Sequence, residues 1–282
     1  MSLPLISIII PYYNKKDTIN RSVDSVLNQT YTNWELIIVD DKSQAPLEVN
    51  EDWNSQKIIC LNNEDNLGPG LSRQRGLDMA KGEFICFLDS DDYWLPDFLS
   101  ESLNVHLNNP SLCATYSQSN MIDGTLRRRN NIEDAQDDLF YAVVSGVRPW
   151  ATCALMWKRK YLSKWSAIRT NEDALFELET ALNNPNVRMI PQVLCVIDKG
   201  KDINESESRL YNFRGNINRT LVLLQALSLL KYYSGKRSVD VKLALWKSLY
   251  AHMKKMIKQH EIYMATKVAT ALIFRINWKL RF

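Results

Sequence analysis

The stretch LISIIIPYYNKKDTINRSVDSVLNQTYTNWELIIVDD, residues 5–41, has the pattern of a strand, a helix and a second strand. Its ends, LISIII at 5–10 and WELIIV at 34–39, are nearly continuous apolar runs, as expected for strands covered on both faces. Between them, apolar side chains recur at the spacing of one helical face, at Ile19, Val23, Val26 and Leu27. Such a unit is typical of a parallel sheet with crossover helices.

The alternation of strands and helices continues to residue 117. Strands are predicted at 57–61, 83–88 and 112–117, and helices at about 69–80 and from Pro96 to about 108. This order predicts an α/β fold with a mainly parallel central sheet flanked by helices.

Beyond residue 117 the pattern is less regular. We expect a long polar loop, a strand, a helix, two short strands and a helical C-terminal region, at 118–148, 150–157, 170–182, within 187–197 and from about 216 onward. We find no internal repeat in the sequence.

Composition is that of a globular protein. The chain has 282 residues, of which 45% are hydrophobic and 24% charged. No apolar run reaches the roughly 20 residues that a membrane-spanning helix needs, and the N-terminus has the features of a buried strand rather than a signal peptide. The five cysteines are scattered singly, four of them in apolar runs, which predicts reduced core residues in a cytoplasmic protein.

Charge is distributed unevenly. From Lys231 onward, twelve Lys and Arg face two acids, a balance of +10, so the overall charge of +3 leaves −7 for the first 230 residues. A predicted helix in this region carries apolar residues on one face, flanked by lysines: Trp246, Leu249, Tyr250, Met253, Met256 and Ile257. The pattern is typical of peripheral membrane binding, which we expect at the cytoplasmic face of the inner membrane. Packing of this face against the catalytic domain or a second subunit is the alternative. Nucleic acid is not an expected partner, because no recognised binding module is present.

Three carboxylates, Asp89, Asp91 and Asp92, follow the strand at 83–88. In an open parallel sheet, ligands bind beyond the carboxyl ends of the strands. Clustered carboxylates there raise one another's pKa unless a cation holds them ionised, and hard oxygen ligands select Mg²⁺ or Mn²⁺. The alternative is an ordinary turn, for which Asp and Ser are also suited.

Two other metal-dependent sites fit this cluster poorly. A calcium loop of the EF-hand kind needs Gly at its sixth position, and counting from Asp89 that position is Trp94. A phosphohydrolase with an aspartyl nucleophile normally carries its Asp-x-Asp after the first strand of its domain, whereas this cluster follows the fourth predicted strand.

Three stretches, SIIIPYYNKKDTINRSVDSVLNQTYTNWELIIVDDKS, NLGPGLSRQRGLDMAKGEFICFLDSDD and NEDALFELETAL, together resemble the family 2 glycosyltransferases of the GT-A fold that build bacterial polysaccharide and lipopolysaccharide. The resemblance is strong over residues 5–98, weaker to about 200, and absent beyond. It implies a GT-A domain at 1–212, followed by a basic amphipathic helical region at 213–282.

The resemblance also implies a reaction. An inverting, metal-dependent glycosyltransferase would move a sugar, a hexose or an N-acetylhexosamine, from a nucleotide-sugar to a hydroxyl of a glycan or lipid-linked oligosaccharide, in O-antigen, lipopolysaccharide or capsule synthesis. Two rivals remain open, a non-catalytic nucleotide-sugar-binding protein of the same fold and a metal-dependent phosphohydrolase. The sugar, the linkage and the oligomeric state are not indicated by the sequence.

Nucleotide-binding residues follow from the same resemblance. It implies that Tyr13 stacks on the base, with Pro11 and Asn14 shaping the loop, and an aromatic face beside a base contributes about 1–3 kcal/mol. Asp41 would accept a hydrogen bond from the N3–H of the base, which favours uracil or thymine over cytosine, and we expect a UDP-sugar. Arg73 would supply a cation near the nucleotide. Packing on the following helix is the alternative for Tyr13, and capping or turn formation is the alternative for Asp41.

Metal and catalytic residues complete the implied site. Asp89 would face the ribose and the metal, Asp91 would bind Mn²⁺ or Mg²⁺ directly, and Asp92 would support it. The base would lie in the pair Glu172-Asp173, with Asp173 taking the acceptor's proton at a pKa raised by nearby phosphates. A capping box from Thr170 to Asp173 is the alternative.

Other polar and aromatic residues are assigned less directly. The three histidines, His106, His252 and His260, fall outside every motif and are expected on helix surfaces. Trp150 could wall the acceptor site, whereas core packing is equally plausible for Trp157.

Overall fold

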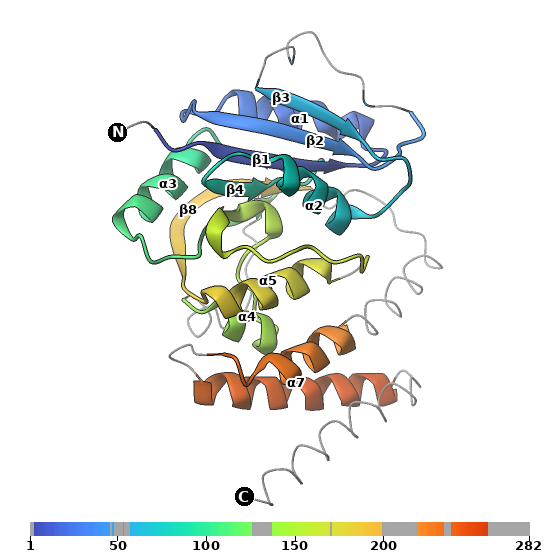
Figure 1. The fold of residues 1–282 in the computed structure, drawn as a ribbon, viewed down its shortest axis with the longest axis vertical. Coiled ribbons are helices and arrows are strands. Elements are labelled where there is room, and N and C mark those ends of the chain that lie inside the picture. The colour runs from blue at the N-terminus through green and yellow to red at the C-terminus, as the bar shows by residue number, and fades with distance from the viewer. Residues whose placement is uncertain are drawn as a thin grey trace, which may run out of the picture.

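The computed structural model describes residues 3–45, 47, 53, 57–125, 137–169, 171–198, 219–233 and 238–258. Among them, the strands form one eight-stranded sheet of order β3-β2-β1-β4-β7-β6-β8-β5. Strands β1 to β3 and helix α1 lie at one end of the molecule and α7 lies at the other, with α4 and α5 between them (Figure 1).

The N-terminal half has the predicted alternation of strands and helices. Its elements are β1 (Ile6–Tyr12), α1 (Lys16–Leu27), β2 (Trp34–Asp40), β3 (Ile58–Asn62), α2 (Pro69–Met79) and β4 (Phe84–Phe87). Strand β1 pairs in parallel with β2 and β4, and β2 pairs in parallel with β3. Successive side chains of β1 enter opposite layers, because Ile9 packs on the α2 side and Ile8 on the α1 and α3 side.

The rest of the sheet is mixed. Its elements are β5 (Tyr93–Trp94), α3 (Phe98–Asn108), β6 (Ala114–Met121), α4 (Leu139–Ser145), β7 (Leu155–Lys158), α5 (Glu172–Asn183) and β8 (Val187–Ile197). Strand β7 runs antiparallel to both β4 and β6, and β5 runs antiparallel to β8. The sheet is therefore parallel among β3, β2, β1 and β4, and again between β6 and β8.

Two predictions for the segment after residue 117 need correction. The expected loop at 118–148 is in part ordered, because β6 continues to Met121 and the apolar run after Asp138 forms α4. Asp138 caps that helix by accepting a hydrogen bond from Tyr141 N at 2.9 Å. The two short strands expected within 187–197 are one strand, β8, whose pairing with β6 shifts register beside Ser117 and Gln118.

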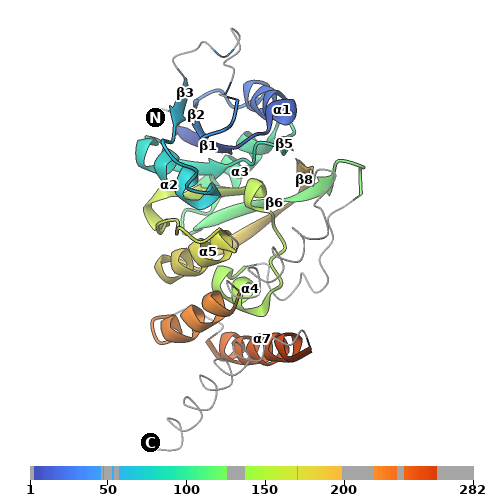
Figure 2. The same ribbon diagram turned by 90° about the vertical axis from the view of Figure 1, so that its right-hand side faces the viewer.

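The C-terminal helices cover the α4 side of the molecule (Figure 2). A helix at 219–229 and α7 (Ser238–Lys258) pack there, and Val241, Leu245 and Leu249 of α7 are fully buried. Part of the face expected to meet a membrane is thus used for internal packing, since Leu249 is buried and Trp246 packs beside it. No helix in the described ranges is long and apolar enough to cross a membrane. The predicted boundary at 212–213 lies outside the described residues, as do the side chains of Met256 and Ile257.

Two of the three histidines are not on helix surfaces. His106 is 2% exposed and its Nε2 lies 3.1 Å from Met156 O, and burial lowers its pKa to about 4. His252 is also buried and its Nε2 lies 2.9 Å from Thr220 Oγ1. Both face the packed side of their helices, which explains the error, and His260 lies outside the described residues.

Candidate functional site

The carboxyl ends of β1, β2 and β4 meet at one edge of the sheet, as parallel pairing requires. Asn14, just after β1, has a left-handed backbone with φ of 52°. Its N–H donates to Ser43 Oγ at 3.0 Å and its Oδ1 accepts from Gln44 N at 2.8 Å, so it ties together the loops after β1 and β2. Tyr13 is 45% exposed and Pro11 is half-buried. The Tyr13 ring is therefore accessible to a stacking base.

Asp41 is buried and already accepts three hydrogen bonds. Asn63 Nδ2 and Leu67 N donate to its Oδ1 at 2.7 and 2.8 Å, and Gly68 N donates to its Oδ2 at 2.7 Å. Asp41 thus holds the loop that leads into α2, which is the turn-forming role considered as its alternative. Oδ1 already accepts two of these bonds, whereas Oδ2 accepts one and can accept a second, so the predicted base contact is compatible with this arrangement through Oδ2.

Arg73 of α2 joins two of the predicted site residues. Its Nη2 donates to Asp89 Oδ1 at 2.6 Å and its Nη1 to Glu172 Oε1 at 3.3 Å, while its guanidinium lies 4.8 Å from the centre of the Trp165 ring. Burial would lower the Arg73 pKa, but the two carboxylates outweigh it and the pKa is raised. Burial raises the pKa of Glu172, with Arg73 opposing.

A close helix approach makes this bridge possible. A Cβ on Gly70 would lie 2.6 Å from Ser166 O and 3.3 Å from Glu172 Cγ. Only glycine leaves room there for α2 to meet the N-terminus of α5.

The three aspartates after β4 point to different partners. Asp91 Oδ2 lies 3.0 Å from Lys15 Nζ. Asp92 is 4% exposed, and its Oδ1 accepts from Asp198 N at 3.0 Å. Burial raises the pKa of Asp92 to about 7, with the Asp89 charge adding to the shift. Within the described residues, no three His, Cys, Asp or Glu side chains converge as a metal site.

Two of these aspartates nevertheless fit a divalent cation. The side chains of Asp89 and Asp91 are 32% and 25% exposed, and each already lies beside a cationic side chain. Mg²⁺ usually takes one or two protein carboxylates and completes its shell with water and substrate phosphates, so a third carboxylate is not needed. Asp92 does not fit, because it is turned into the protein toward Asp198.

Asp173, at the start of α5, belongs to a second bridge that the sequence did not predict. Arg148 Nη2 donates to Asp173 Oδ2 at 2.7 Å and to Glu177 Oε1 at 2.7 Å. The other oxygen of Asp173 accepts from Ala174 N at 2.8 Å. Asn171 occupies the N-cap position without a side-chain capping bond, and Thr170 lies outside the described residues.

The expectation of a raised pKa is not met at Asp173. Burial alone would raise its pKa, but the Arg148 charge and hydrogen bond lower it to about 2. Burial instead raises the pKa of Glu177 to about 7, against the pull of Arg148. The sequence does carry a signal for this bridge. Asp173 and Glu177 are spaced i, i+4 on a helix with an apolar inner face, and a buried carboxylate requires a cation beside it.

Trp150 does not wall an acceptor site. It is 1% exposed, and its indole N–H donates to Glu177 Oε1 at 3.1 Å. Trp157 is equally buried, in line with core packing.

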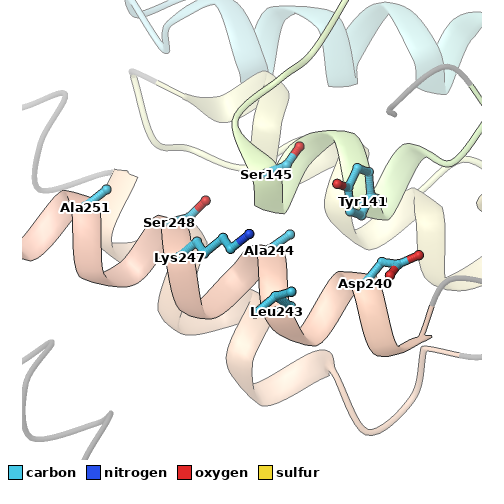
Figure 3. A pocket seen from close by; sticks show the side chains of 8 residues that line it. All are labelled: Tyr141, Ser145, Asp240, Leu243, Ala244, Lys247, Ser248 and Ala251. Carbon is cyan, nitrogen blue, oxygen red and sulfur yellow. The ribbon is translucent and has the colours of Figure 1, made fainter. Parts of the chain in front are cut away.

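A pocket of about 310 Å³ lies between α4 and α7, away from the sheet edge (Figure 3). It is lined by Tyr141, Ser145, Asp240, Leu243, Ala244, Lys247, Ser248 and Ala251. None of the predicted site residues is among them, so this pocket is separate from the sheet edge.

The sequence of residues 7–166, more than half of the chain, matches the family described as Glycosyl transferase family 2. The chain belongs to that family. It is 42% identical over 106 residues to the UDP-Glc:alpha-D-GlcNAc-diphosphoundecaprenol beta-1,3-glucosyltransferase WfgD of Escherichia coli, covering 37% of this chain and 42% of that protein. It is 39% identical over 103 residues to the putative teichuronic acid biosynthesis glycosyltransferase TuaG of Bacillus subtilis, covering 36% and 41%. The chain therefore spans less than half the length of these relatives.

Solved structures agree on the fold. TarS 1-349 of S. aureus in complex with UDP-GlcNAc superposes with a TM-score of 0.68 at 19% identity, covering 88% of this chain and 72% of that one. The mannosyltransferase PcManGT of Pyrobaculum calidifontis, in complex with GDP-Man and Mn²⁺, gives 0.59 at 16% identity, covering 95% and 81%. The fold of this family 2 chain is GT-A, as predicted from its motifs.

Proposed function

We propose that the chain is an inverting, metal-dependent glycosyltransferase that uses a UDP-sugar and acts on a glycan or lipid-linked acceptor in cell-surface polysaccharide synthesis. The observation that carries the proposal is the junction at Arg73, where the aspartate after β4 and the acidic start of α5 come together. These two elements supply the family's metal and base motifs. WfgD, whose name specifies a UDP-glucose donor and an alpha-D-GlcNAc-diphosphoundecaprenol acceptor, supports the choice of substrates.

The donor would lie along the sheet edge. Tyr13 would stack on the base and Asp41 would accept from its N3–H. Asp91, with Asp89 beside it, would hold Mn²⁺ or Mg²⁺, and the cation would neutralise the charge that develops on the diphosphate as it leaves. Lys15 and Arg73, the present partners of these aspartates, would then be free to turn toward the phosphates.

The acceptor would be activated at Asp173. Its carboxylate would take the proton of the attacking hydroxyl while the hydroxyl oxygen forms a bond to the anomeric carbon. The bond from that carbon to the phosphate oxygen breaks, and its electron pair leaves with UDP. Attack from the face opposite the leaving group inverts the anomeric centre.

One observation favours a second candidate, a nucleotide-sugar-binding protein without transfer activity. Asp173 is ion-paired to Arg148 and has a lowered pKa, which makes it a weak base in the arrangement described. No comparable feature favours the phosphohydrolase.

A donor panel separates these candidates. We expect UDP-sugars with Mn²⁺ to raise the melting temperature of the protein, and acceptor-dependent release of UDP to accompany sugar transfer. Stabilisation without transfer would favour the binding protein, release of inorganic phosphate without acceptor would favour the hydrolase, and stabilisation by GDP-mannose alone would contradict the role of Asp41.

We also propose peripheral attachment to the cytoplasmic face of the inner membrane, through the outer face of α7. Val239, Leu243 and Tyr250 are 75%, 53% and 52% exposed, and Lys247 and Lys254 are exposed among them. Each lysine near an anionic leaflet contributes about 1 kcal/mol to binding. The buried residues of α7, Val241, Leu245 and Leu249, are not part of this face, although Leu243 and Lys247 also border the pocket beside α4.

A further inference from the structure

The side chains behind Asp173 form a cluster to which the proposed reaction assigns no part. Arg148 comes from the segment between α4 and β7, and a single nitrogen, Nη2, donates to both Asp173 and Glu177. These two carboxylates stand one turn apart on the same face of α5. The two hydrogens of this nitrogen can serve one carboxylate each, so the charge of the arginine is shared between two acceptors.

The two acceptors differ in their access to solvent. The side chain of Asp173 is 25% exposed, whereas that of Glu177 is 1% exposed. Glu177 Oε1 also accepts the Trp150 indole N–H, and its Oε2 has no hydrogen-bond partner among the described residues. Asp173 can be reached by an acceptor sugar, and Glu177 cannot.

Sharing the arginine links the charges of the two acids. A negative charge on Glu177 offsets that of Arg148 and so weakens the pull that lowers the pKa of Asp173. When Glu177 is neutral, Arg148 is committed to Asp173 and leaves it a weaker base. The other charged groups that face this cluster, one from helix 219–229 and two from the Arg73 bridge, are Arg219, Arg73 and Glu172.

We propose that Glu177 is a positioning residue that, through Arg148, sets the orientation and basicity of Asp173, so that transfer requires Glu177 in its charged form. The inference rests on the proposed function and deepens it by naming what controls the base. With Glu177 ionised, Arg148 is drawn toward the buried carboxylate, and a lone pair on Asp173 Oδ2 becomes available to the acceptor hydroxyl.

The test is the pH profile of transfer by the full chain, with wild type and Glu177→Gln compared between pH 5 and pH 9. We expect wild-type kcat to fall as the pH drops through about 7, the pKa of Glu177. Glu177→Gln should lower kcat at pH 8 at least tenfold, leave the KM for the donor unchanged, and remove the loss of activity near pH 7. Glu177→Asp should recover part of the rate and restore that loss. The matched control is Glu179→Gln, a half-buried acid on the same helix outside the cluster, which should behave as wild type.

Trp150→Phe is a second, milder variant for the case in which Glu177→Gln does not fold. It removes a donor to the ionised form of Glu177, so the acid limb of kcat should move to higher pH while the rate at high pH is retained. A wild-type enzyme that transfers sugar, with Glu177→Gln or Trp150→Phe showing the parental profile, would overturn this inference alone. A wild type that binds UDP-sugars but transfers nothing would instead overturn the proposed function.

Discussion

Arg73 and Arg148 each bridge two carboxylates, but they do so in different surroundings. Arg73 joins Asp89, with a side chain 32% exposed, to Glu172 at the rim of the sheet. Arg148 joins Asp173 to Glu177, which is 1% exposed. Both arginine side chains are buried, at 6% and 13% exposed, so the bridges differ in their carboxylates. Asp89 can exchange its arginine for water, whereas removing the cation from the enclosed Glu177 is costly. The Arg73 bridge is thus suited to opening for a substrate, and the Arg148 bridge to staying assembled.

Replacement of Asp173, the proposed base, tests whether the Arg148 bridge takes part in the reaction. Asp173→Asn should lower the transfer rate about 10³-fold, because general base catalysis typically contributes that much, while UDP-dependent stabilisation persists. Transfer assays and thermal melts with UDP measure the two effects. Asp240→Asn, an exposed acid of α7 outside the site, is the control and should retain activity. A parental rate in Asp173→Asn would move the base to another residue, with Glu172 the first to examine.

The free energies of unfolding of two arginine variants test whether the Arg73 and Arg148 bridges differ as described. Arg148→Met leaves Glu177 buried without its cation and should lower the free energy of unfolding by about 3 kcal/mol at pH 8. Arg73→Met is the matched variant and should cost less, because Asp89 can turn to water. Chemical denaturation of both proteins measures the difference. Equal losses would show that exposure does not distinguish the two bridges.

The parts of the site that the sequence predicts are those governed by local pattern. Strands β1, β2 and β4 follow from apolar runs, and parallel pairing then places Asn14, Asp41 and Asp89 at one edge. The Arg148 bridge depends instead on a segment, 146–151, whose path between α4 and β7 is set by packing. Apolar periodicity does not give the direction of β7 either, so its antiparallel course was missed.

Apolar periodicity also does not reveal that the polar side chains of Trp150 and His106 are buried. The aromatic side chain of Trp150 suits a sugar ring and could wall an acceptor site, but its indole N–H donates to the buried Glu177 instead. His106 was placed on a surface because no motif contains it, yet it lies on the inner face of α3. In both cases a polar atom found its partner far along the chain, which spacing alone does not reveal.

The metal assignment divides the aspartates after β4. With UDP at 100 times its dissociation constant, measured in the presence of Mn²⁺, the wild type should gain about 2.7 kcal/mol in stability. Asp91→Asn should lose the Mn²⁺-dependent part of this gain, whereas Asp92→Asn should keep it, because Asp92 is turned toward Asp198. Titrations of melting temperature against Mn²⁺ separate the two variants. Loss of the gain in Asp92→Asn with retention in Asp91→Asn would reverse the assignment.

The smallest effect concerns the outer face of α7, at the end of the molecule opposite β1 (Figure 1). Lys247→Gln combined with Lys254→Gln should weaken binding to anionic vesicles by about 2 kcal/mol, roughly 1 kcal/mol for each lysine, and should not change binding to neutral vesicles. Co-sedimentation at two salt concentrations measures this, because screening reduces the electrostatic part of the binding. Lys160→Gln, an exposed lysine outside this face, is the control.

If the double variant binds anionic vesicles as wild type does, the exposed lysines of α7 have no role at a membrane. If binding falls while transfer to a soluble acceptor is unchanged, attachment and chemistry belong to separate regions. That separation is expected from the packing, because α7 buries Val241, Leu245 and Leu249 and leaves Tyr250 and Lys254 exposed. An amphipathic helix held in this way can meet a lipid surface without disturbing the two arginine bridges.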